Sequence, residues 1–205
     1  MPVNESARTS PQTFTDFMRM KFKGILDAIG EWVNRSGLDP NTITLLGLGG
    51  SIIGALLLAW GMLPLGGIII LVMGLVDAVD GTMARLRGEP TRFGGFVDSV
   101  TDRYVELLIY GGLLVYFLRQ GDAWTSGFVF LAAGGSVLVS YVKARAEALG
   151  FEAKIGILTR MERYMVLVPS LVFGFPKVGI AAVAILANVT ALQRIVHVRK
   201  QAKGK

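Results

Sequence analysis

Four aspartates, Asp77, Asp80, Asp98 and Asp102, lie within or beside long apolar runs of the chain. A charged side chain near the centre of a bilayer costs roughly 2.5–3.5 kcal/mol, so each of these groups needs a partner that neutralises it. A cluster of carboxylates without His or Cys nearby favours hard cations such as Mg²⁺, Mn²⁺ or Ca²⁺ over zinc. The aspartates are therefore predicted to hold divalent metal ions.

The spacing of the aspartates predicts how they meet. The first pair is three residues apart and the second pair four, so each pair lies on one face of its own helix. Gly88 and Pro90 interrupt the helical pattern between the pairs, which turns the second helix back antiparallel to the first. The two pairs are therefore expected to face each other, with Arg85 nearby as a cation for a phosphate that the metals also bind.

This stretch resembles the signature of the CDP-alcohol phosphotransferase family, D-x2-D-G-x2-A-R-x8-G-x3-D-x3-D. Its specified positions are all filled, by Asp77, Asp80, Gly81, Ala84, Arg85, Gly94, Asp98 and Asp102. The resemblance implies transfer of a phosphatidyl group from CDP-diacylglycerol to an alcohol, with release of CMP and with two Mg²⁺ or Mn²⁺ ions held by the four aspartates. It also implies that Asp102 accepts the proton of the attacking hydroxyl, as a metal ligand, a base or both.

The resemblance extends to the nucleotide and to the acceptor alcohol. The CDP-lipid is expected to contact Asn41, Thr42, Thr44, Asp77, Gly81, Arg85 and Thr91. Simple helix capping by Asn41 and Thr42 is an alternative role for those two residues. A Ser-Tyr-x-Lys-Ala-Arg-Ala-Glu segment, an Arg-x-Glu-Arg segment and a Gln-Arg pair are similar to the phosphatidylinositol phosphate synthases of this family. They imply that the phosphate of inositol 1-phosphate binds Ser140, Lys143, Arg160, Arg163 and Arg194.

These cations have an ordinary alternative role, because Lys and Arg at helix ends commonly extend to lipid phosphates. The four aspartates alone would also suit a proton or cation relay, or a divalent-cation transporter, which would not need the cations. Within the family, a phosphatidylglycerophosphate synthase, an archaetidylinositol phosphate synthase with an ether-lipid donor, and an enzyme making a soluble inositol phosphodiester stay open. The absence of Cys and of a Ser-His pair favours one direct displacement without a covalent intermediate.

The composition indicates a membrane protein. The chain has 205 residues, of which 52% are hydrophobic and 18% charged, and it has no cysteine. The net charge of +6 does not indicate nucleic acid, because only Arg119 and Lys177 fall in loops assigned to the outside. This positive-inside pattern predicts an even number of spans in the cell membrane, with both termini and the active site cytoplasmic. Residues 1–12 are polar, so no cleavable signal peptide is expected there.

Hydrophobic periodicity predicts an all-α integral membrane protein with six transmembrane helices preceded by an N-terminal amphipathic interfacial helix. The segments are a disordered tail (1–12), the amphipathic juxtamembrane helix (13–36), the six-helix membrane domain (37–200) and a basic tail (201–205). The spans are predicted at 43–62, 65–86, 96–118, 124–144, 164–175 and 178–198, the fifth starting nearer Met161. The linker Phe151–Leu158 shows no pattern. Membrane lipids are expected partners, and abundant glycines suit a homodimer.

Overall fold

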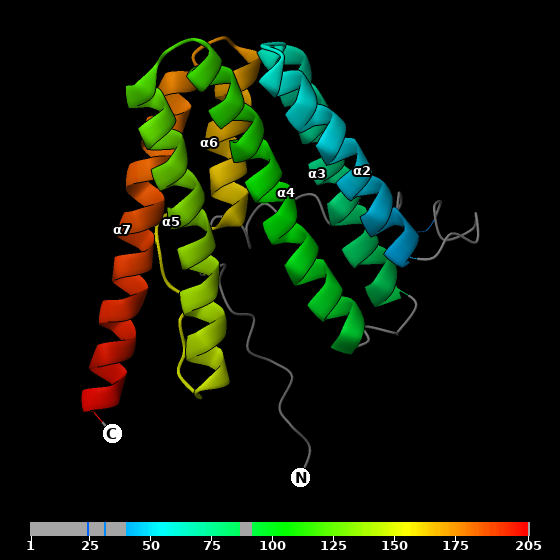
Figure 1. Cartoon of the computed structure of the whole chain (residues 1–205). Coiled ribbons are helices and arrows are strands. Elements are labelled where there is room, and N and C mark those ends of the chain that lie inside the picture. Colours follow the sequence, from blue (N-terminus) through cyan, green and yellow to red (C-terminus); the bar gives the residue numbers. More distant parts are fainter. Residues whose placement is uncertain (1–23, 25–30, 32–39, 87–91, 205) are drawn as a thin grey trace.

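The computed structural model describes residues 24, 31, 40–86 and 92–204. The two long described ranges form six α-helices, which pack lengthwise into one bundle (Figure 1). They are α2 (Pro40–Ala59), α3 (Leu63–Leu86), α4 (Arg92–Arg119), α5 (Ala123–Ala148), α6 (Arg160–Val172) and α7 (Pro176–Lys203). Each predicted span corresponds to one helix, and the helix ends differ from the predicted ends by a few residues.

Several sequence predictions fall outside the described residues. These are the tail at 1–12, nearly all of the amphipathic helix at 13–36, and Thr91. The side chains of Asn41, Asp80, Gly81 and Arg85 are not described either. At the other end of the chain, α7 continues to Lys203, so most of the segment predicted as a basic tail is helical. Cations in the last turn of a helix interact favourably with its dipole, which supports this extension.

Three of the described helices contain segments that are long and apolar enough to cross a membrane: Thr42–Ala59, Ala123–Ala148 and Pro176–Lys203. Helix α3 contains a shorter apolar segment, Leu63–Val79. Helix α4 has 28 residues, but it carries Asp98, Asp102, Arg103 and Glu106. Helix α6 has only 13 residues, a length of about 20 Å. Charge in α4 and shortness in α6 therefore set these helices apart from the apolar three.

The helices alternate in direction, so the turns α2–α3, α4–α5 and α6–α7 lie together at one end of the bundle, called the turn end here (Figure 1). The opposite end, the motif end, contains the start of α2, the last residues of α3, the start of α4 and the last residues of α5 and α7. Helix α6 begins partway along the bundle, after the irregular linker 149–159. Its first residue therefore lies at the depth of the motif and not at the surface of the bundle.

The core is built from aliphatic side chains between neighbouring helices. Helix α2 packs against α3 and α4, α5 packs against α4 and α7, and α6 packs against α3 and α7. Helices α2 and α4 approach closely at Gly112, where a Cβ atom would lie 2.3 Å from the carbonyl oxygen of Ala55. Only glycine fits this contact, which therefore sets the distance between α2 and α4.

Candidate active site

Three of the four predicted aspartates lie together at the motif end. Asp77 comes from α3, and Asp98 and Asp102 come from α4; one carboxylate oxygen of each lies within 4.8 Å of the others. Asp98 is exposed, Asp77 is partly exposed and Asp102 is buried. Carboxylate oxygens at this separation suit a hard divalent cation, because such a cation binds several oxygen ligands at about 2.0–2.6 Å. The donor set therefore fits the predicted metal.

Helix packing fixes the position of the motif helix α3. Val79 and Met83 of α3 pack against Ile43 in the first turns of α2. The same turns carry two predicted nucleotide residues, of which Thr42 is exposed and Thr44 is buried. The start of α2 thus lies beside the part of α3 that carries the motif. This proximity is necessary if both segments contact the same CDP-lipid.

Arg160, the first residue of α6, connects this helix to the carboxylates of α3 and α4. Its Nη1 donates to Asp77 Oδ2 at 2.9 Å, and its Nη2 lies 2.7 Å from Asp102 Oδ1. The guanidinium also lies over the ring of Tyr164, 5.6 Å from the centroid, a cation–π arrangement. The helix start is fixed by a capping box, in which the Thr159 backbone N–H donates to the Glu162 carboxylate at 2.5 Å. Capping of α6 thereby positions Arg160.

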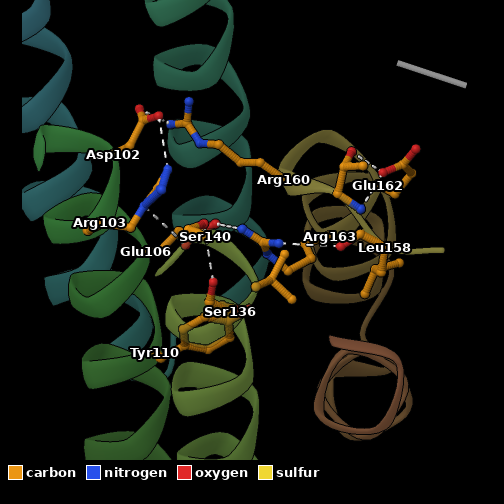
Figure 2. A network of polar contacts seen from close by, with 12 residues as sticks. Asp102, Arg103, Glu106, Tyr110, Ser136, Ser140, Leu158, Arg160, Glu162 and Arg163 are labelled. Atoms are coloured by element: carbon orange, nitrogen blue, oxygen red, sulfur yellow. Dashed lines mark hydrogen bonds and ion pairs between the residues drawn. The ribbon is translucent and has the colours of Figure 1, made fainter. Parts of the chain in front are cut away.

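A second ion pair lies deeper in the bundle, between α4 and α6 (Figure 2). Arg163 Nη2 lies 2.5 Å from Glu106 Oε1, and the two side chains are only 2% and 3% exposed. Arg103 lies between two of the carboxylates of α4, with its Nη2 3.4 Å from Asp102 Oδ2 and its Nε 4.0 Å from Glu106 Oε2. The polar network of α4 therefore continues one helical turn beyond Asp102.

Glu106 was missed by the sequence analysis, although a signal for it exists. It follows Asp102 by four residues and Asp98 by eight, so it continues the same helix face. A buried carboxylate needs a cationic partner, and Arg163 is the nearer of the two arginines that contact Glu106. One turn further along α4, the Tyr110 hydroxyl lies 3.1 Å from Ser136 Oγ of α5. The face of α4 is thus polar over several turns.

The five residues predicted to bind the acceptor phosphate have different partners in the structure. Arg160 contacts the aspartates and Arg163 contacts Glu106. Arg194 is 5% exposed and donates to two backbone carbonyls, Ile155 O at 2.8 Å and Val139 O at 2.5 Å. The other two belong to α5, where Lys143 lies 3.8 Å from Glu147 and the Ser140 hydroxyl donates to the Ser136 carbonyl oxygen at 3.4 Å. The common phosphate pocket stays a prediction.

Comparisons with known proteins agree with the motif. The family model for CDP-alcohol phosphatidyltransferase matches residues 38–196. The chain is 34% identical to the phosphatidylinositol phosphate synthase of Streptomyces avermitilis, over 98% of this chain and 90% of the relative. It is also 34% identical to the archaetidylinositol phosphate synthase of Pyrococcus horikoshii, over 90% of this chain and 96% of the relative. These matches cover nearly the whole length of each relative.

Solved structures show the same arrangement of helices. The Mycobacterium tuberculosis phosphatidylinositol phosphate synthase with CDP-DAG bound has a TM-score of 0.79 and 31% identity, over 85% of this chain and 93% of that chain. The same enzyme in complex with manganese and citrate also has a TM-score of 0.79, over 84% of this chain. The resemblance noted in the motif is thus confirmed over most of the sequence and in three dimensions. The chain is a membrane protein and a transferase, and it belongs to the CDP-alcohol phosphatidyltransferase family.

Proposed function

We propose that this protein transfers a phosphatidyl group from CDP-diacylglycerol to inositol 1-phosphate, giving phosphatidylinositol phosphate and CMP. The observation that carries the proposal is the cluster of Asp77, Asp98 and Asp102, whose carboxylate oxygens lie within 4.8 Å of one another at the motif end. The choice of acceptor is supported by similarity to the Streptomyces and Mycobacterium synthases. The cations of α5, α6 and α7 near this end are consistent with an acceptor that carries a phosphate.

The reaction is a single displacement at the phosphorus atom that carries the diacylglycerol. The acceptor hydroxyl oxygen forms a bond to this phosphorus, and the bond from the phosphorus to the bridging oxygen breaks, so that CMP leaves with the electron pair. The proton of the hydroxyl goes to Asp102, the most buried of the three described aspartates. Two divalent ions, held by Asp77, Asp98 and Asp102 with Asp80, would bind the pyrophosphate and stabilise the developing negative charge.

Exposure divides the predicted acceptor residues into two groups. The side chains of Arg160 and Lys143 are 26% and 43% exposed, so they can reach a phosphate directly. Arg163 and Arg194 are buried against Glu106 and against backbone carbonyls. We therefore assign direct phosphate contact to Arg160 and Lys143, and to Ser140 one turn before Lys143 on α5. Arg163 and Arg194 are assigned a positioning role.

The test is CMP release by the purified full-length protein in detergent with Mg²⁺ and CDP-diacylglycerol. Inositol 1-phosphate, glycerol 3-phosphate, free inositol and serine are compared as acceptors. We expect release with inositol 1-phosphate and a loss of this release in Lys143→Ala. Release with glycerol 3-phosphate alone would instead identify a phosphatidylglycerophosphate synthase, and release with free inositol would contradict a requirement for the acceptor phosphate.

An ether-lipid donor is a second candidate, because the Pyrococcus relative is an archaetidylinositol phosphate synthase at the same identity as the Streptomyces enzyme. The two candidates use the same acceptor and differ only in the linkage of the lipid chains to glycerol. The same assay with ester and ether CDP-lipids of equal chain length distinguishes them, since the preferred donor gives the higher kcat/KM.

We also propose that all six helices, α2 to α7, span the cell membrane as one domain (37–200), with the motif end and both termini cytoplasmic. The support is the distribution of cations, with Arg119 and Lys177 at the turn end and most others elsewhere. The natural chain has no cysteine, so single cysteines at Gln120 and Ala202 can be labelled without background. A membrane-impermeant maleimide applied to intact cells should label the first position and not the second.

We also propose a homodimer, because glycines of α4 and α5 leave open space at the surface of the bundle. A Cβ atom at Gly111, Gly127 or Gly134 would meet no other atom within 4 Å. Small residues of this kind let helices of two copies approach closely in a membrane. Light scattering of the protein in detergent, corrected for the bound detergent, measures the oligomeric state.

A further inference from the structure

Arg160 contacts two of the carboxylates that suit a metal, through a hydrogen bond to Asp77 and an ion pair with Asp102. Its two terminal nitrogens reach Asp77 Oδ2 at 2.9 Å and Asp102 Oδ1 at 2.7 Å, so the planar guanidinium bridges α3 and α4 from its place at the start of α6. Figure 2 shows the side chain extending from α6 towards Asp102. The Arg160 side chain is 26% exposed. The Arg160 guanidinium thus contacts two carboxylates while its side chain stays partly open to solvent.

The same aspartates are the ones whose oxygens approach Asp98 closely enough to share a divalent cation. Both oxygens of Asp102 already face guanidinium groups, Oδ1 facing Arg160 and Oδ2 facing Arg103. A divalent ion would lie about 2.0–2.6 Å from its ligand oxygens. Two positive groups at such distances from the same carboxylates repel each other in a poorly solvated site. We propose that Arg160 and a divalent cation compete for Asp77 and Asp102, so that binding of the cation displaces the Arg160 guanidinium.

Arg160 is better suited to this exchange than Arg103. Arg103 belongs to α4 itself, contacts Asp102 at the longer distance of 3.4 Å, and retains Glu106 as a second partner. Arg160 follows the irregular linker 149–159, and it is the first residue of α6. A helix N-terminus carries partial positive charge and disfavours a cation, so Arg160 depends on an anionic partner. When the aspartates bind metal, a phosphate group is the partner that fits.

This consequence rests on the proposed function, because it makes Arg160 available to the acceptor phosphate once the metal is bound. The competition itself does not depend on the reaction. Since binding free energies are reciprocal, an anion that binds the displaced Arg160 should also strengthen metal binding. The order of loading would then favour metal before acceptor.

The test measures Mn²⁺ binding to the full-length protein in detergent, from the loss of the free Mn²⁺ signal in electron paramagnetic resonance. Arg160→Gln should bind Mn²⁺ about three- to tenfold more tightly than the unchanged protein, because a competing cation is removed. Arg160→Lys should fall between the two, since an ammonium group cannot bridge both carboxylates. Arg199→Gln, which removes an exposed cation of α7, should bind as the unchanged protein does. Equal or weaker binding by Arg160→Gln would overturn the proposal.

A second measurement needs no variant and decides the matter if Arg160→Gln does not fold. Phenylglyoxal modifies guanidinium groups, and peptide mass spectrometry gives the rate at each arginine. Modification of Arg160 should be several-fold faster in Mg²⁺ than in EDTA, while Arg163, buried against Glu106, should stay slow in both. An unchanged or slower rate at Arg160 would contradict the exchange. Because neither measurement requires turnover, each can fail while CMP release succeeds, and the reverse also holds.

Discussion

Two ion pairs, one beside the active site and one at the turn end, have similar lengths and very different surroundings. Arg163 and Glu106 are 2.5 Å apart and 2% and 3% exposed. Lys177 and Asp122 are 2.7 Å apart and 67% and 21% exposed. A buried pair has lost the hydration of both ions, so removal of one partner leaves an uncompensated charge. An exposed pair is screened by water and contributes little. Burial, and not bond length, decides what each pair contributes.

The comparison extends to the whole of each end. The motif end concentrates charged side chains between α3, α4 and α6. The turn end relies on short turns and on close backbone packing, as at Gly112. The region that performs chemistry is therefore expected to be sensitive to the loss of single charges, and the turn end to changes in shape.

The largest effect is expected for Asp102→Asn. The amide cannot accept the proton and is a poorer metal ligand, so CMP release should fall by about 100-fold or more. The matched control is Asp122→Asn, which alters a carboxylate at the turn end. Steady-state rates of both variants in detergent give the comparison, and a similar fall in the two would show that the carboxylates of the motif end have no special role.

The buried pair is tested by Glu106→Ala, which leaves Arg163 buried without its counterion. We expect the free energy of unfolding to fall by about 3–5 kcal/mol. The double variant Glu106→Leu with Arg163→Leu removes both charges, and it should recover most of this loss. Denaturant titrations in detergent micelles measure the two values. A single variant as stable as the unchanged protein would contradict the importance given to burial.

Packing at the turn end is tested by Gly112→Ala. The added methyl group would lie 2.3 Å from the Ala55 carbonyl oxygen, so α2 and α4 must separate. The expected cost is about 1–3 kcal/mol of unfolding free energy. Gly111→Ala is the matched control, because its methyl group would meet no other atom within 4 Å. That variant should stay within about 0.5 kcal/mol of the unchanged protein.

The smallest effect is expected for the exposed pair. Lys177, together with the backbone N–H and hydroxyl of Thr125, lowers the pKa of Asp122 from 3.8 to about 2. Because the folded value lies below the unfolded one, this stabilisation is present above about pH 4 and is lost as the pH falls towards 2. Lys177→Met should therefore lower the melting temperature slightly at pH 7, and the two proteins should converge near pH 2. A constant difference across this range would refute the assignment.

Much of the fold follows from the sequence, because each predicted span has apolar residues at helical spacing and is bounded by breaks or caps. The meeting of Asp77 with Asp98 and Asp102 was also predictable, since two paired faces on adjacent antiparallel helices must oppose each other. The number of membrane spans does not follow from hydrophobic composition in the same way. The charges of α4 and the shortness of α6 remove both helices from the set that composition alone identifies.

The partners of the arginines could not be predicted. Arg160 and Arg163 are three residues apart, and the resemblance to the synthases implied that both bind one acceptor phosphate. In the structure, the two side chains contact different carboxylates of α4, one helical turn apart: Arg160 contacts Asp102, in addition to Asp77 of α3, and Arg163 contacts Glu106. Arg194 binds the carbonyl oxygen of Ile155, and a backbone acceptor in an irregular linker has no sequence signature. Tertiary placement, and not residue type, decides these contacts.

The short helix α6 has a consequence for the position of its first side chain. Its length of about 20 Å is less than the roughly 30 Å of a bilayer's hydrocarbon core. The linker before it is held by protein, since the Leu158 backbone N–H donates to Thr190 Oγ1 at 3.0 Å. Irregular backbone at such depth is tolerated only when it is buried in protein or lines a watery recess. Packing of the linker against α7 therefore allows α6 to begin inside the bundle, where its first side chain, Arg160, reaches the carboxylates of α3 and α4.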